Sequence, residues 1–195
     1  MKKYIIPFIC LFGGLVFISF LSIKPDSHIN DYPNLPAPIA KENILLTNVG
    51  QAVEGEILKQ IVNDLNLDGD YRPRALASDL YDYQSLVISI GYSPTGLANT
   101  PRSFEEEKQR LRDLTKEAEL QGIPVVVLHL SNDYKGDART WELIHQAIPK
   151  ANYFIGIESV VDRANQTELF QSNSIPYTLV NNLEEIRTPL NSAFR

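Results

Sequence analysis

Three polar segments each follow a short apolar run, and their side chains are of types that bind small molecules. The predicted site residues are Thr47, Asn48, Gly50 and Gln51 in the first segment, Ser93, Thr95 and Gly96 in the second, and His129 in the third. Their hydroxyl, amide and imidazole groups exchange hydrogen bonds, and a helix start after Gly50 would offer free N–H groups to an anion. We therefore predict a site for a small polar or anionic ligand.

The same residue types also have structural roles. Thr47 and Asn48 suit helix caps, and Gly50 suits a tight turn. On its apolar strand, His129 is interpreted as a hydrogen-bonded structural histidine rather than a catalytic base. The alternative function is a hydrolase or transferase that uses His129 with Ser93 or Asp133, and a further alternative is an envelope scaffold or interaction protein. We favour a binding domain over an enzyme.

Two acidic segments contain carboxylates of the kind found in functional sites, but both have a structural interpretation. Residues 64–70 resemble the opening of a calcium loop, but the position of its bidentate carboxylate is occupied by Ala75. We interpret this segment as a glycine turn that ends a helix, and predict no metal site. Glu105, Glu106 and Glu107 are interpreted as solvated carboxylates at a helix start. No nucleophile elbow, phosphate loop or dinucleotide fingerprint occurs in the sequence, and we predict no cofactor.

The elements that would position these residues alternate between apolar strands and amphipathic helices. Strands are predicted at residues 44–47, 86–90, 125–130, 153–157 and 177–180, with a short edge strand at 71–76 that Pro73 disfavours. Helices are predicted at 51–65, 104–121, 140–148 and 165–172, with a helical turn at 183–186. Strands that are apolar throughout are typical of a parallel sheet covered on both faces. The prediction is a three-layer, mostly parallel α/β fold, Rossmann-like or flavodoxin-like, with the polar segments at one edge.

Several stretches resemble the DUF6305 family of exported bacterial α/β proteins of unknown function. They are residues 45–51 after the first strand, residues 90–97 after the central strand, and residues 122–125 leading into His129. The resemblance covers most of residues 42–195. It implies an α/β fold and an exported location, and it implies no activity.

The chain begins with Lys2 and Lys3, followed by an uncharged run from Tyr4 to Ile23. A helix of roughly 20 such residues crosses a bilayer, and positive charge stays on the cytoplasmic side. We predict a signal-anchor or signal peptide at residues 1–24, and favour the uncleaved anchor because small residues are missing at a cleavage site. Residues 25–41 are predicted to be a Pro-rich tether, and residues 42–195 one extracytoplasmic domain.

Composition limits the partners. The formal net charge is −6, and three of the lysines belong to the first 24 residues, so the domain itself is more acidic. Nucleic acid is therefore an unsuitable partner. The membrane is the expected partner of the Tyr4 to Ile23 run, which places the protein in the cell membrane as a single-pass protein, or outside the cell if the run is cleaved. The sequence identifies neither the ligand nor protein partners.

Overall fold

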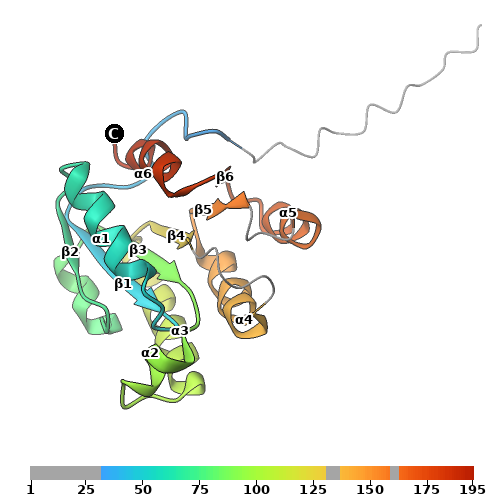
Figure 1. Cartoon of the computed structure of the whole chain (residues 1–195). Coiled ribbons are helices and arrows are strands. Elements are labelled where there is room, and N and C mark those ends of the chain that lie inside the picture. The colour runs from blue at the N-terminus through green and yellow to red at the C-terminus, as the bar shows by residue number, and fades with distance from the viewer. Residues whose placement is uncertain (1–31, 131–136, 159–162) are drawn as a thin grey trace, which may run out of the picture.

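The computed structural model describes residues 32–130, 137–158 and 163–195, and its core is one parallel sheet (Figure 1). The strands are β1 Ile44–Val49, β2 Gly69–Tyr71, β3 Ser85–Ile90, β4 Val125–His129, β5 Tyr153–Ile157 and β6 Tyr177–Val180. They pair in the order β2-β1-β3-β4-β5-β6, and all five pairings are parallel. The first five strands thus follow the flavodoxin-like order, with β6 added at one edge.

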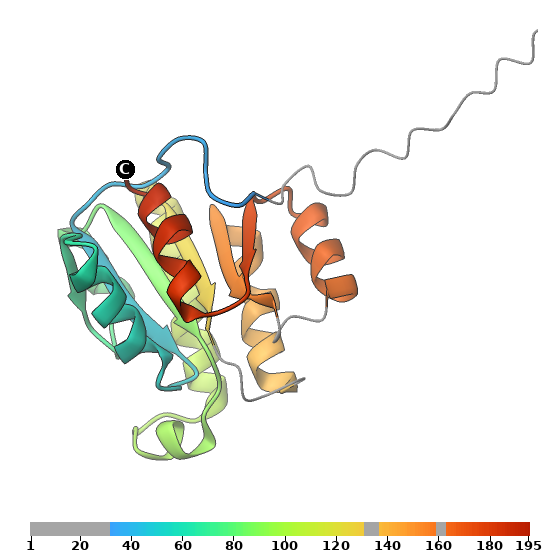
Figure 2. The same cartoon turned by 45° about the horizontal axis from the view of Figure 1, so that its top comes forward.

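Helices cover both faces of the sheet, which confirms the predicted three-layer α/β architecture. They are α1 Glu54–Asp64, α2 Pro94–Ala98, α3 Phe104–Gln121, α4 Ala138–Ala147, α5 Arg163–Ser172 and α6 Arg187–Ser192, with short 3-10 turns η1 Ala77–Asp82, η2 Ile148–Lys150 and η4 Leu183–Ile186. One hydrophobic cluster lies between the sheet and the α1 and α6 face, and a second lies between the sheet and α3, α4 and α5 (Figure 2). Because both faces are covered, most strand residues are buried.

Three elements differ from the sequence prediction. The edge strand β2 comes earlier than residues 71–76, because Gly69 to Tyr71 pair with β1 before Pro73 removes a backbone donor. Helix α2 was expected to be a loop, but Ser93 caps it through its hydroxyl and Pro94 occupies its first turn. Helix α6 continues directly from η4, where only one turn was expected.

The segment that resembles a calcium loop begins as the end of α1. The helix stops at Asp64, and Asn66 takes the positive φ of 53°. The predicted glycine turn is therefore wrong in detail, because an asparagine adopts the left-handed conformation that it tolerates better than most residues. Gly69 instead begins β2, and its Cα lies beneath Val62 of α1.

Residues 32–43 form a strap along the amino-terminal edge of the sheet (Figure 2). Tyr32 exchanges hydrogen bonds with the start of β6, at Tyr177 and Thr178, and Lys41 does so with Ser85 at the start of β3. Between these ends, Leu35 is buried and donates its backbone N–H to Ser192 of α6. The described part of the predicted tether is therefore bound to the domain.

The strap leads to a stability prediction. We expect Leu35→Ala to lower the free energy of unfolding by about 2 kcal/mol, the lower end of the range for a buried leucine, because Leu35 lies at the rim of the core. Ile39→Ala is the matched control, since that side chain is 37% exposed and should cost less than about 1 kcal/mol. Urea unfolding of both variants measures the difference; equal losses would contradict a packed role for Leu35.

Within the described residues, no helix combines the length and the apolar character needed to cross a membrane. The run from Tyr4 to Ile23, residues 25–31 and Asp133 all lie outside those residues. The anchor, the location and the use of Asp133 therefore stay predictions.

Candidate functional site

The loops that follow β1 and β3 lie side by side at the carboxyl edge of the sheet, as expected. The Gly91 carbonyl accepts the Ala52 N–H at 3.1 Å, and Ser93 donates its N–H to the Gly50 carbonyl at 2.8 Å. Gln51 and Tyr92 form a short antiparallel bridge between the loops. In the sheet, β2 lies on one side of β1 and β3 on the other, so the chain reverses its direction of winding between β1 and β3. Open α/β sheets bind ligands at this topological switch point.

Two glycines allow the loops to come this close. A Cβ on Gly50 would lie 2.4 Å from the Gly91 carbonyl oxygen, and a Cβ on Gly96 would lie 2.0 Å from the Gln51 oxygen. Gly50 also has φ +89°, a conformation that L side chains rarely adopt. Both glycines therefore hold the loops together, whether or not a ligand binds.

A buried ion pair of α3 supports the loop after β1, from the face of the sheet opposite α1. Glu107 and Arg110 of α3 pair at 2.6 Å, with side-chain exposures of 0% and 3%. The Glu107 carboxylate also accepts hydrogen bonds from the Gly50 N–H at 3.2 Å and the Gln51 amide at 2.8 Å. The interpretation of Glu107 as a solvated carboxylate is wrong, because its side chain points from α3 toward the loop after β1, whereas Glu105 and Glu106 are exposed.

The pKa of Glu107 reflects this pairing. Burial acts to raise the pKa of its carboxyl group, but the hydrogen bonds and charge of Arg110, with smaller contributions from Gln51 and Gly50, outweigh burial and lower the pKa below its usual value. The carboxylate is therefore ionised at neutral pH. It contributes stability that is present above the pKa of the unfolded chain and is lost as the pH falls through the lowered pKa.

Several predicted ligand residues have structural partners in this network. The Thr47 hydroxyl accepts a hydrogen bond from Arg110 at 3.4 Å on the α3 face. Ser93 accepts the Gly96 N–H at 3.0 Å as the cap of α2. Thr95 is exposed on α2. The contact with Arg110 thus places Thr47 on the α3 face of the sheet, whereas Asn48 lies on the α1 face.

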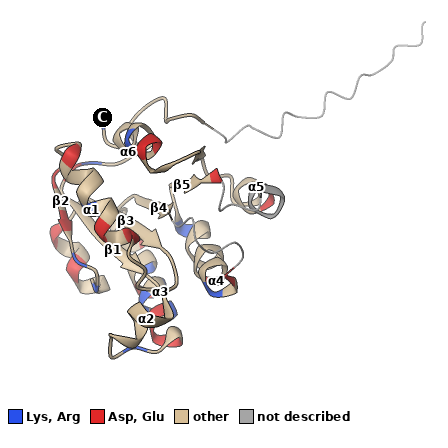
Figure 3. Cartoon of the chain, viewed as in Figure 1, with Lys and Arg blue, Asp and Glu red and all other residues tan. Residues whose placement is uncertain are grey.

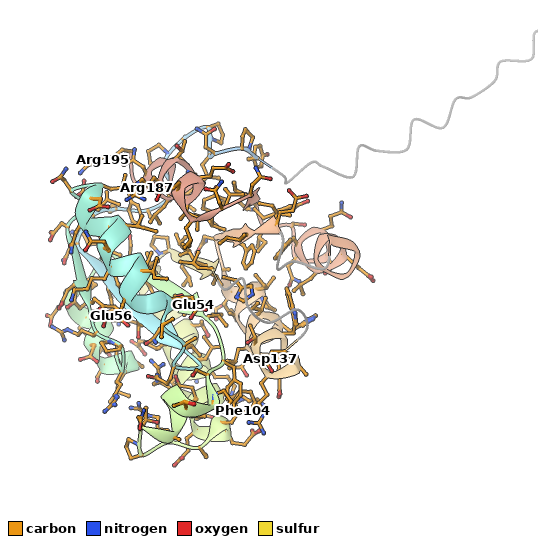
Figure 4. The ribbon with its side chains drawn as sticks, viewed as in Figure 1. Glu54, Glu56, Phe104, Asp137, Arg187 and Arg195 are labelled. Atoms are coloured by element: carbon orange, nitrogen blue, oxygen red, sulfur yellow. The ribbon has the colours of Figure 1, made fainter. Side chains whose placement is uncertain are left out.

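Beneath the start of α1, three oxygen atoms are enclosed and, among the described residues, have no hydrogen-bond partner. They are Asn48 Oδ1, Glu54 Oε2 and Ser89 Oγ. Glu54 is only 5% exposed. In Figure 4, Glu54 is labelled near the middle of the view, between Arg187 and Arg195 at the top and Phe104 below. Enclosed oxygens without partners are costly, so a hydrogen-bond donor from outside the described residues would stabilise them.

His129 ends β4 and points to the α4 face of the sheet, opposite the face that carries Asn48 and Ser89. Its ring is buried, lies edge-on to Trp141 at 6.0 Å, and contacts the Ile90 carbonyl through Nδ1 at 2.8 Å. A carbonyl only accepts, so Nδ1 carries the proton, which confirms the expected hydrogen-bonded histidine. Burial lowers its pKa, although the Ile90 bond and the charges of Glu54 and Asp137 oppose this effect. The neutral ring keeps Nε2 as an acceptor.

Glu54 and Ser89 were missed by the sequence prediction. Glu54 has the ordinary signal of an acidic residue in the first turn of a helix, and Ser89 is a single hydroxyl in an apolar strand. A serine within the run 86–90 was the available signal, because a strand that is buried on both faces rarely includes an unpaired hydroxyl. Among the described residues, no group of three or more His, Cys, Asp or Glu side chains could hold a metal ion.

The fold and this edge define an open, parallel α/β domain with a candidate ligand site at its topological switch point. The chain belongs to the DUF6305 family, a domain of unknown function, whose model matches residues 41–194. The resemblance predicted from the sequence is thereby confirmed. Searches of curated proteins and of solved structures found no match.

Proposed function

We propose that the domain binds a small polar solute at the switch point between β1 and β3. The observation that supports this is the cluster of enclosed oxygens on Asn48, Glu54 and Ser89. These oxygens are mainly acceptors, so the solute would supply hydrogen-bond donors. The sequence predicted a small polar or anionic ligand, and the Glu54 carboxylate favours a polar solute over an anionic one.

The pairing of His129 favours binding over catalysis. A hydrolase using His129 and Ser93 needs a hydrogen bond between the base and the nucleophile. Here the His129 Nδ1 pairs with the Ile90 carbonyl, and the Ser93 hydroxyl caps α2. We further propose that the domain acts outside the cytoplasm, tethered by the run from Tyr4 to Ile23, as a solute sensor or an accessory of an envelope process.

Two serines of β3 provide a matched test. A thermal-shift screen of the full chain against sugars, polyols and amino acids should give a compound that raises the melting temperature. We expect Ser89→Ala to abolish that rise while leaving the stability of the free protein unchanged or slightly higher, because the lost hydroxyl has no partner among the described residues.

Ser85→Ala is the control. Its buried hydroxyl accepts the Lys41 N–H at 2.9 Å and donates to the Lys41 carbonyl at 2.6 Å. We expect this variant to lose about 1–2 kcal/mol of stability and to keep the rise. A screen without any stabilising compound, or a rise that survives Ser89→Ala, would contradict the proposed site.

A further inference from the structure

We infer that the enclosed position beneath α1 receives a monovalent cation, either an alkali metal ion or the head of a protonated primary amine. This inference rests on the proposed function, because it uses the same oxygens of Asn48, Glu54 and Ser89. It adds the charge of the bound group.

The three oxygens share one face of the sheet. Asn48 and Ser89 are direct register partners on β1 and β3. Asn48 lies two positions after Leu46, and Ser89 lies two positions after Val87. Leu46 and Val87 belong to the hydrophobic cluster between the sheet and α1, so the side chains of Asn48 and Ser89 point toward α1 as well. They therefore stand next to each other beneath the same helix.

The start of α1 closes this position from above. A Cβ on Gly55 would lie 2.9 Å from the Asn48 Cβ, so the first turn of α1 lies directly on Asn48. A Cβ on Gly91, two residues after Ser89, would lie 3.2 Å from Glu54 Oε2. The carboxylate is thus held against the end of β3, on the face that carries the other two oxygens.

The chemistry of the oxygens selects a positive partner. The Asn48 amide donates to the Ala52 carbonyl at 2.9 Å, so its Nδ2 is used and its Oδ1 is left to accept. A carboxylate only accepts, and a serine hydroxyl can accept as well. Carboxylate, amide and hydroxyl oxygens are the ligands that hard cations prefer.

The net charge around the position limits the cation to one positive charge. Glu54 supplies one negative charge, which the helix start offsets by roughly half a charge. The acidic residues of α1 lie near its two ends (Figure 3), and Glu54 and Glu56 are the ones in its first turn. His129 is neutral because burial lowers its pKa. One carboxylate balances a monovalent ion, whereas divalent cations usually require more.

The test uses the full chain in choline chloride, whose cation is too bulky for an enclosed position. Choline is replaced at constant ionic strength by sodium, potassium or methylammonium chloride, and the melting temperature is recorded. We expect a saturable rise with at least one of these salts. A rise with sodium or potassium assigns an alkali ion, and a rise with methylammonium alone assigns an amine head group.

Glu54→Gln and Glu56→Gln form the matched pair. Both remove one carboxylate from the first turn of α1, but Glu56 is exposed and pairs only with Lys59 at 3.9 Å among the described residues. The measured quantity is the cation concentration that gives half of the full rise in melting temperature. We expect this midpoint concentration to rise at least tenfold in Glu54→Gln and to stay unchanged in Glu56→Gln. Ser89→Ala, which should fold normally, is expected to raise the midpoint concentration as well.

Two results would overturn the inference. One is a melting temperature that no tested cation changes. The other is an equal response of the Glu54 and Glu56 variants, which would show a nonspecific salt effect. In either case, a neutral solute that still raises the melting temperature through Ser89 in choline chloride would keep the proposed function.

Discussion

Glu107→Ala is expected to lower the free energy of unfolding by about 3–5 kcal/mol, the usual cost of leaving one buried charge without its partner. Arg110 would keep its bonds to the carbonyls of Ala75 and Asn48 but lose its counter-ion. The Gly50 N–H and the Gln51 amide would lose an acceptor at the same time. Urea unfolding at pH 7 measures the loss.

Two further variants separate the buried pair from a general effect of charge. Glu105→Ala removes an exposed carboxylate from the same turn and should cost less than about 0.5 kcal/mol. Replacing both Glu107 and Arg110 with apolar residues should recover part of the loss, because no isolated charge remains buried. If Glu107→Ala is no more harmful than Glu105→Ala, the pair does not support the loop.

Gly50→Ala is the second substitution for which we expect a large effect, a loss of roughly 3 kcal/mol or more. The positive φ alone costs about 1–2 kcal/mol for a residue with a Cβ, and the close contact with the Gly91 carbonyl adds to this cost. The loop would have to move away from Gly91, so ligand binding should weaken together with stability.

A substitution at Gly122 separates the cost of the positive φ from the cost of the close contact. It ends α3 with φ +67°, and a Cβ there would meet nothing within 4 Å. We expect Gly122→Ala to cost only the conformational term, about 1–2 kcal/mol. Chemical denaturation of both variants gives the difference, which measures the contact with Gly91. Similar losses in the two variants would show that the close approach is unimportant.

The sequence predicts the sheet well because a short, continuous apolar run between polar segments is typical of a strand buried on both faces. The runs at 86–90 and 153–157 correspond closely to β3 and β5, and helix α3 has the predicted bounds because Ser103 begins it and Gly122 ends it. Helix α2 was missed although Ser93 and Pro94 were its signal. Its five residues are too few for a helical period to be recognised.

The candidate site was harder to predict because its residues have the same sequence signals as ordinary surface positions. Glu107 and Arg110 are three residues apart, a spacing that marks exposed helical pairs equally well. Glu54 looks like any first-turn acid. What distinguishes these residues is burial, which depends on how α1 and α3 lie on the sheet and so on packing between distant segments.

The strap determines where the molecule can be held without covering its candidate site. Tyr32 meets the start of β6, and Arg195 contacts Glu42 and Asn66 close to the starts of β1 and β2. Both ends of the described chain thus leave from the amino edge, with the switch point on the far side. A sensor chip, a bead or a fusion partner attached at either end would leave the carboxyl edge facing open solution.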